Sequence, residues 1–136
     1  MKASCTYVPS DFQPLDLKVP IEAGLPVGLM TMKKTYEGEM AGESFTLFTS
    51  AFDREANTGT YLAMEVFRGR LHGKEGGFCY LHLADTQGGD RRNEVLRIVP
   101  FSGTGALAGI EGTGRMVIAP DWTHTLTLEY TLPSEK

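Results

Sequence analysis

The residues of this chain best suited to acid–base chemistry, Glu65 and His82, lie among aromatic residues between positions 60 and 84. That stretch reads as two alternating strands folded back on each other across Gly73, Gly76 and Gly77. Alternate side chains of a strand point to the same face of the sheet. The residues that share a face in this way are Tyr61, Ala63, Glu65, Phe67 and Gly69 in the first strand, and Phe78, Tyr80 and His82 in the second.

Both polar residues have more than one interpretation. An unpaired carboxylate at Glu65 in an apolar interior is costly, and desolvation would favour its neutral form, as in a general acid or a donor that anchors a ligand. Alternatively, Glu65 is paired internally and fixes the register, or it faces outward. His82 is either a core histidine bonded to Glu65 or to a tyrosine hydroxyl, or a residue that shuttles protons or binds a ligand. Counting back from the turn at glycines 73 to 77 predicts that Phe67 lies nearer than Glu65 to the position opposite His82.

Aromatic side chains on these faces would either line a pocket or fill the interior. Small binding proteins combine an apolar lining with a few polar groups that orient the ligand. The predicted ligand-binding residues are therefore Tyr61, Glu65, Phe67, Phe78, Tyr80, His82 and Tyr130. No residue is assigned a catalytic role.

Metal and thiol chemistry have little support in the sequence. His72, His82 and His124 show no paired spacing, so neither a metal site nor a cofactor is expected. His72 shares a face with arginines 68 and 70, opposite Glu65, and is predicted to be solvated. Cys5 and Cys79 are expected to be free buried thiols, and Cys79 lies on the face of its strand opposite His82.

The rest of the chain repeats the strand-and-turn pattern. Strands are predicted at residues 1–8, 29–36, 39–52, 94–102, 115–119 and 123–132, besides the two strands between 60 and 84. Residues 9–27 contain four prolines and are predicted to be irregular, with one short edge strand at residues 15–19. Residues 102–114, SGTGALAGIEGTG, are interpreted as a tight turn with Leu107 and Ile110 packed inward. A phosphate-binding loop is disfavoured there because no helix pattern follows.

No stretch shows a sustained helical period, so the chain is predicted to be all-β with little or no helix. About eight strands joined by consecutive hairpins favour a closed antiparallel β-barrel, because closure removes the two bare edges of an open sheet. At 136 residues the chain is expected to form one domain. A net charge of −4 argues against nucleic acid as a partner. With neither a long apolar run nor a leader pattern, we expect a cytoplasmic protein that does not enter the membrane.

Four segments carry a family resemblance. Residues 34–43 read KTYEGEMAGE, residues 64–73 MEVFRGRLHG, residues 76–82 GGFCYLH and residues 99–109 VPFSGTGALAG. From about Gly28 to Leu132 the chain resembles the bacterial family called domain of unknown function 3224 (DUF3224). The resemblance implies a small closed barrel similar to allene oxide cyclase, related more widely to the lipocalins. The family has no established activity, and no motif here matches the catalytic residues of the plant cyclase, so the resemblance leaves the function open.

The sequence therefore predicts a barrel that binds a small, largely apolar molecule, with Glu65 and His82 as polar anchors. An isomerase or cyclase that uses Glu65 as its acid or base is one alternative. Another is a filled barrel without catalysis that acts through partner contacts or as a homo-oligomer. A cavity above roughly 300 Å³ favours binding, whereas continuous packing favours the filled barrel.

Overall fold

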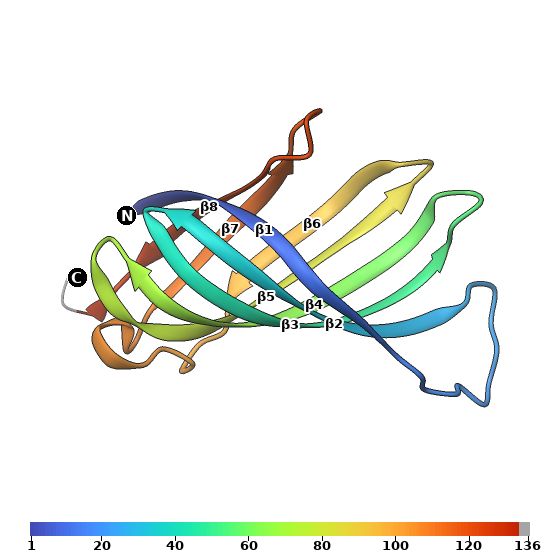
Figure 1. The fold of residues 1–136 in the computed structure, drawn as a ribbon, viewed down its shortest axis with the longest axis horizontal. Coiled ribbons are helices and arrows are strands. Elements are labelled where there is room, and N and C mark those ends of the chain that lie inside the picture. The colour runs from blue at the N-terminus through green and yellow to red at the C-terminus, as the bar shows by residue number, and fades with distance from the viewer. Residues whose placement is uncertain (134–136) are drawn as a thin grey trace.

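The chain folds into a closed barrel of eight antiparallel strands that follow one another around the ring in sequence order (Figure 1). The computed structural model describes residues 1–133. The strands are β1 (Lys2–Leu15), β2 (Val27–Gly38), β3 (Met40–Asp53), β4 (Thr58–Leu71), β5 (Lys74–Gln87), β6 (Asp90–Ile98), β7 (Glu111–Ile118) and β8 (His124–Thr131). A 3₁₀ turn, η1 (Gly105–Leu107), lies in the connection between β6 and β7. The predicted fold class is confirmed.

Alternation decides which side chains enter the barrel. In β4, Ala63, Glu65 and Phe67 are between 0% and 2% exposed, whereas the residues between them face outward. In β5, Phe78, Tyr80 and His82 are buried in the same way. The prediction that these two faces point into the barrel is confirmed for all of these residues, and Tyr61 is half-buried near one end.

The register between β4 and β5 differs from the predicted one. Leu71 pairs with Lys74, so the turn consists of His72 and Gly73 alone, at φ 48° and 75°. Two successive residues with positive φ form the tight hairpin turn whose twist matches that of the strands. His82 consequently lies opposite Ala63. Glu65 therefore lies nearer than Phe67 to the position opposite His82. The opposite prediction is wrong because it placed the reversal at glycines 73 to 77.

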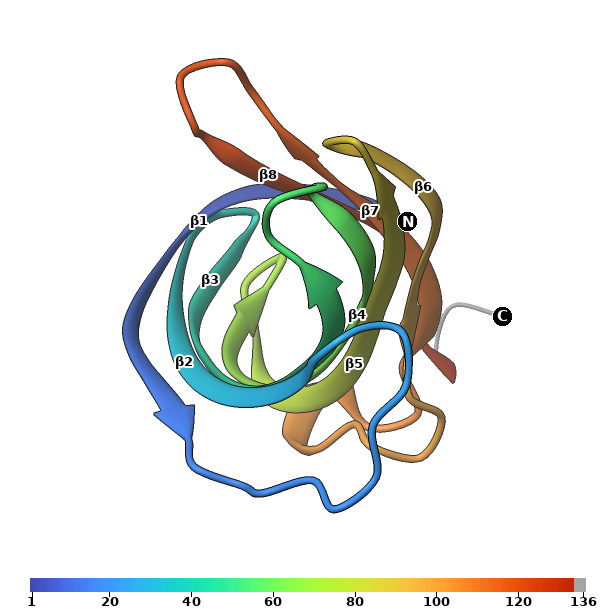
Figure 2. The same ribbon diagram turned by 90° about the vertical axis from the view of Figure 1, so that its right-hand side faces the viewer.

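The proline-rich segment is shorter than predicted. β1 continues through Pro9 and Pro14 to Leu15, so the irregular stretch covers residues 16–26 rather than 9–27. β1 pairs with β8 only from Lys2 to Tyr7, and beyond that point β1 is hydrogen-bonded to β2 alone. A strand with one free edge accommodates proline, which lacks the backbone N–H that a second neighbour would need. Residues 16–26 are exposed apart from Leu25 and run along the rim of the barrel (Figure 2).

One end of the barrel is closed by the connection between β6 and β7. Leu107 and Ile110 are fully buried and belong to the same core cluster as Phe67, Phe78 and Tyr130. The backbone N–H of Thr104 donates to the carbonyl oxygen of Gly77 over 2.8 Å and ties the connection to β5. The structural interpretation of the glycine-rich stretch is confirmed, because its apolar residues pack inward beneath the barrel.

The ring is closed unevenly. β6 and β7 share a single residue pair, Arg97 with Thr113, whereas β7 pairs with β8 along its whole length. Figure 1 shows β6 diverging from β7 away from the closed end.

No helix within residues 1–133 has the length and apolar character needed to cross a membrane.

Candidate functional site

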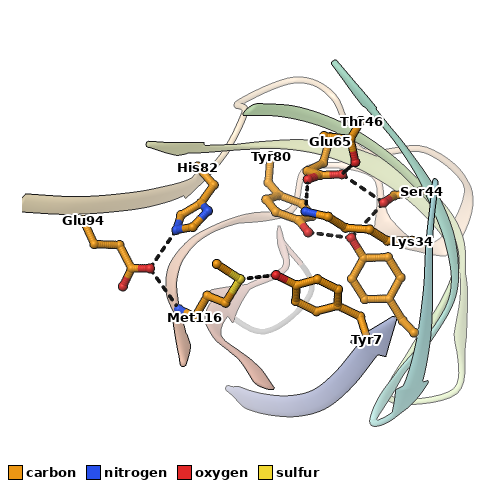
Figure 3. A network of polar contacts seen from close by, with 10 residues as sticks. Tyr7, Lys34, Ser44, Thr46, Glu65, Tyr80, His82, Glu94 and Met116 are labelled. Carbon is orange, nitrogen blue, oxygen red and sulfur yellow. Dashed lines mark hydrogen bonds and ion pairs between the residues drawn. The ribbon is translucent and has the colours of Figure 1, made fainter. Parts of the chain in front are cut away.

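The centre of the barrel holds a buried ion pair. The Lys34 ammonium group of β2 contacts the Glu65 carboxylate of β4, and these two residues are 8% and 0% exposed (Figure 3). The other carboxylate oxygen accepts hydrogen bonds from Thr46 Oγ1 at 2.5 Å and Ser44 Oγ at 3.0 Å. Internal pairing, one of the interpretations of Glu65 from the sequence, is therefore the arrangement found. A buried carboxylate with an ammonium group and two hydroxyl donors has its charge compensated.

Tyrosines extend this network across the barrel. The Tyr36 hydroxyl lies 2.8 Å from Ser44 Oγ and 2.6 Å from the Tyr80 hydroxyl. Burial raises the pKa of both phenols, and the nearby Glu65 charge raises it further. Lys34 Nζ also lies 4.8 Å from the centre of the Tyr7 ring, within range of a cation–π contact. The tyrosines therefore stay neutral and link β2, β3, β4 and β5 through hydroxyl groups.

His82 belongs to a second polar cluster nearer the open end. Its Nε2 lies 2.7 Å from Glu94 Oε2, and that oxygen also accepts the backbone N–H of Met116 at 3.2 Å. Arg91 Nη2 donates to the Met116 carbonyl oxygen over 2.6 Å. Side chains of β6 thus satisfy backbone groups of β7 where the two strands do not pair. Burial lowers the pKa of His82, and the Glu94 carboxylate opposes that shift.

A hollow of about 500 Å³ opens at the end of the barrel opposite η1. It is lined by Pro26, Val27, Gly28, Met30, Phe48, Ser50, Phe52, Arg54, Asn57, Tyr61 and Thr86. Figure 2 looks into the barrel from this end. Phe48 and Tyr61 stack with ring centres 5.5 Å apart, and His82 meets the Tyr61 ring edge-on at 5.4 Å. The apolar part of the hollow thus adjoins the His82 cluster.

The seven predicted ligand-binding residues divide among three places. Tyr61 lines the hollow, and His82 supports it from behind. Glu65 and Tyr80 belong to the central network. The other three, which pack in the filled core, are Phe67, Phe78 and Tyr130. Glu65 pairs with Lys34, and His82 pairs with Glu94. The interpretation in which His82 bonds to Glu65 is therefore not the arrangement found.

Sequence reasoning missed Lys34, Arg91, Glu94 and Phe48. The signal for Lys34 was present, because it lies between Met32 and Tyr36 on the alternating inward face of β2. Arg91 and Glu94 are three positions apart and would lie on opposite faces of a regular strand. They reach the same cluster because β6 carries a register irregularity opposite residues 83–85 and Asn93 has a positive φ of 57°. Nothing in the local pattern of β6 indicates that these side chains turn toward β7.

His72 is an exposed residue, as predicted, but its side chain is partly covered by two contacts. Its side chain is 28% exposed, its Nδ1 contacts the Tyr130 hydroxyl, and its Nε2 lies 3.2 Å from Glu39 Oε2.

Both cysteines are free: Cys5 is buried, which raises the pKa of its thiol to about 11, and Cys79 is half-buried. Within residues 1–133, no group of three or more His, Cys, Asp or Glu side chains is placed to hold a metal ion.

The protein is therefore a small closed β-barrel of eight antiparallel strands, with a buried ion pair at its centre and a hollow at one mouth. The chain belongs to the DUF3224 family, described as proteins of unknown function, whose pattern matches residues 11–130. A crystal structure of a DUF3224 protein of unknown function from Shewanella oneidensis MR-1 is similar, with a TM-score of 0.86 and 26% sequence identity over 97% of this chain and 96% of that one. Comparison with curated proteins gave no match.

Proposed function

We propose that this protein binds a small, largely apolar molecule in the hollow at the open end of its barrel. The observation that supports this most directly is the size and lining of the hollow, about 500 Å³ with Met30, Phe48 and Tyr61 on its walls. Ligand pockets in proteins span about 300 to 1,000 Å³ and are mostly apolar with a few polar groups. The hollow has both properties, whereas the other half of the interior is filled by side chains.

The polar groups of the hollow favour a ligand with an acidic end. Arg54 and Asn57 stand at the rim. Burial raises the pKa of the Tyr61 phenol, and Arg91, which lies behind Tyr61, partly opposes that shift. A guanidinium group at the mouth suits a carboxylate that remains near water while the apolar part enters the barrel. In this proposal Tyr61 contacts the ligand and His82 holds the Tyr61 ring in place.

Acid–base turnover at Glu65 has less support. Its carboxylate is fully buried and already accepts from Lys34, Ser44 and Thr46, and Glu65 does not line the hollow. A general base must reach the proton that it removes. The arrangement therefore suits a group that organises the walls of a binding site rather than one that reacts with a substrate.

Titration calorimetry with dodecanoate, an apolar chain with a carboxylate head, tests the proposal. We expect saturable binding of one molecule per chain. Ser50→Trp places a large ring in the hollow and should abolish binding, whereas Thr49→Trp on the outward face of the same strand should leave it unchanged. Arg54→Ala should weaken dodecanoate more than dodecanol. Binding that survives Ser50→Trp would place the ligand elsewhere and refute the proposal.

A further inference from the structure

Each end of the barrel has one long connection, and the two connections are placed differently. At the closed end, the connection between β6 and β7 carries Leu107 and Ile110 into the core, where both are fully buried. At the open end, the connection between β1 and β2, residues 16–26, is called the strap here. It carries Leu17 and Ile21, which are 61% and 80% exposed, and Figure 2 shows it running along the rim rather than across the mouth. The chain thus supplies apolar side chains for both ends but buries them at only one.

The strap continues the alternating pattern of a half-buried strand. Residues 15–22 read LDLKVPIE, so that Leu17, Val19 and Ile21 follow one another on one face and charged residues predominate on the other. Such alternation is typical of an extended segment that has one face covered. In the structure neither face of the strap is covered, because every residue from 16 to 24 is exposed.

The strap is tied to the barrel at its two ends. At one end Leu15 pairs with Leu29, and at the other the Phe52 backbone N–H donates to the Pro26 carbonyl oxygen over 3.0 Å. Within the part of the chain that the structure describes, residues 18–25 form no hydrogen bond or ion pair. A segment without such contacts can move while the strands at its ends stay in place.

The mouth of the hollow lies within reach of the strap. The strap arches around an open space of about 520 Å³, whose lining includes Leu17, Val19 and Ile21, and this space shares Pro26 and Val27 with the hollow. Fully extended, the eleven residues of the strap measure about 36 Å, so a loop fixed at both ends extends roughly 18 Å from them. The strands that line the hollow, β2 to β5, are separated by three spacings of about 4.8 Å, or about 14 Å in all.

From these observations we infer that the strap is the outer wall of the ligand site and folds across the mouth when a ligand enters the hollow. In the closed position Leu17, Val19 and Ile21 contact the apolar part of the ligand, and the charged face of the strap stays in water. Closure over an empty hollow would leave a void beneath these side chains, and a void provides no atoms for them to contact. The ligand fills that void, so closure follows binding. The inference rests on the proposed function, because the ligand is that of the hollow.

Two matched double variants test the strap by titration calorimetry with dodecanoate. Leu17→Ser with Ile21→Ser removes most of the apolar face and should weaken binding at least about tenfold, because two aliphatic side chains no longer leave water on closure. Asp16→Ser with Lys18→Ser changes the other face and should leave the Kd within about twofold, as at other surface sites. All four positions are exposed, so both variants should keep the circular dichroism spectrum of wild type. Equal Kd values for the two variants would overturn the inference and leave the proposed function in place.

Trypsin reports the position of the strap directly, since Lys18 is its one basic residue. Without ligand we expect cleavage after Lys18, which is exposed. Saturating dodecanoate should slow this cleavage at least about tenfold in wild type, because closure protects the backbone. It should protect neither Leu17→Ser with Ile21→Ser nor Ser50→Trp, and the latter also controls for an effect of dodecanoate on trypsin itself. Dodecanoate that binds without protecting Lys18 would overturn the inference alone, whereas a wild type that does not bind dodecanoate would overturn the proposed function together with it.

Discussion

The two halves of the barrel interior are built from the same strands but are filled differently. In the closed half Phe67, Phe78 and Leu71 meet Leu107 and Ile110 from the connection after β6, and all five are at most 2% exposed. In the open half Met30, Phe48, Phe52 and Tyr61 surround a hollow, and residues 16–26, which run along that rim (Figure 2), are largely exposed. The alternation of the strands supplies apolar side chains to both halves. The two halves therefore differ because of the segment that covers each end of the barrel.

The central network marks the boundary between the halves. Lys34 and Glu65 lie between the filled core and the hollow, with Tyr36 and Tyr80 on the core side and the His82 cluster toward the mouth. Polar side chains across a barrel restrict how its strands can slide, because a shift of register would separate buried partners. We therefore expect the closed half and the network to carry stability, and the open half to carry binding.

The largest effect is expected from Glu65→Ala. The substitution leaves the Lys34 ammonium group buried without its counter-ion and removes the acceptor for Thr46 and Ser44. Leaving one charge of a buried pair uncompensated typically costs about 3 to 5 kcal/mol. Urea denaturation should show this loss of unfolding free energy.

The double variant Glu65→Gln with Lys34→Met separates the ion pair from simple packing. It removes both charges and keeps an oxygen that can accept from Thr46 and Ser44. Replacing both partners of a buried pair is often close to neutral. We expect it to be more stable than Glu65→Ala. A double variant as unstable as the single one would show that charge compensation is not what the network supplies.

The comparison of the two halves is tested next by two phenylalanines. Phe67→Ala removes a ring that is 1% exposed from the filled core and should cost about 3 to 4 kcal/mol, as for other buried aromatic residues. Phe48→Ala removes a half-buried ring from the wall of the hollow, and should cost less than half as much while weakening dodecanoate binding. Equal losses in urea melts would mean that the mouth is as tightly packed as the core.

A smaller effect is expected at the β4–β5 turn. His72→Ala removes contacts to Tyr130 and Glu39, and a hydrogen bond contributes about 1 kcal/mol on balance. That exceeds the about 0.5 kcal/mol expected of a solvated surface residue. His72→Gly loses the same contacts but relieves the positive φ of 48°. If His72→Ala is neutral in thermal or urea melts, the ring contacts contribute nothing and the sequence-based view of His72 stands.

Local alternation made much of the barrel predictable. It placed Glu65, Phe78 and His82 inside correctly, because a strand's two faces follow from the sequence alone. It could not name Lys34 as the partner of Glu65, since the stagger of the strands around a barrel decides which distant residues meet. The turn at His72 was missed because a histidine with positive φ carries no signal as clear as that of glycine. Proline is typical of irregular chain, whereas the free edge of β1 accommodates Pro9 and Pro14 within a strand.

The smallest effect concerns pH and the boundary between the halves. Burial holds the pKa of His82 below its ordinary value of 6.5, and Glu94 only partly offsets this. As pH falls below 6.5 the unfolded chain binds a proton at this position before the folded chain does, so stability decreases until the folded-state pKa is passed. Above 6.5 the contribution is complete. His124, whose pKa burial also lowers, adds a slope of the same sign.

His82→Gln isolates the part that His82 contributes. Urea melts between about pH 7 and pH 5, where an ordinary histidine titrates, should show a shallower loss of stability in the variant than in wild type. The remaining slope should shrink again in the double variant with His124→Gln. Parallel curves for wild type and His82→Gln would mean that His82 keeps its ordinary pKa in the folded state. The cluster of His82 and Glu94 would then be hydrated like the mouth, which would move the boundary between the two halves inward to Lys34 and Glu65.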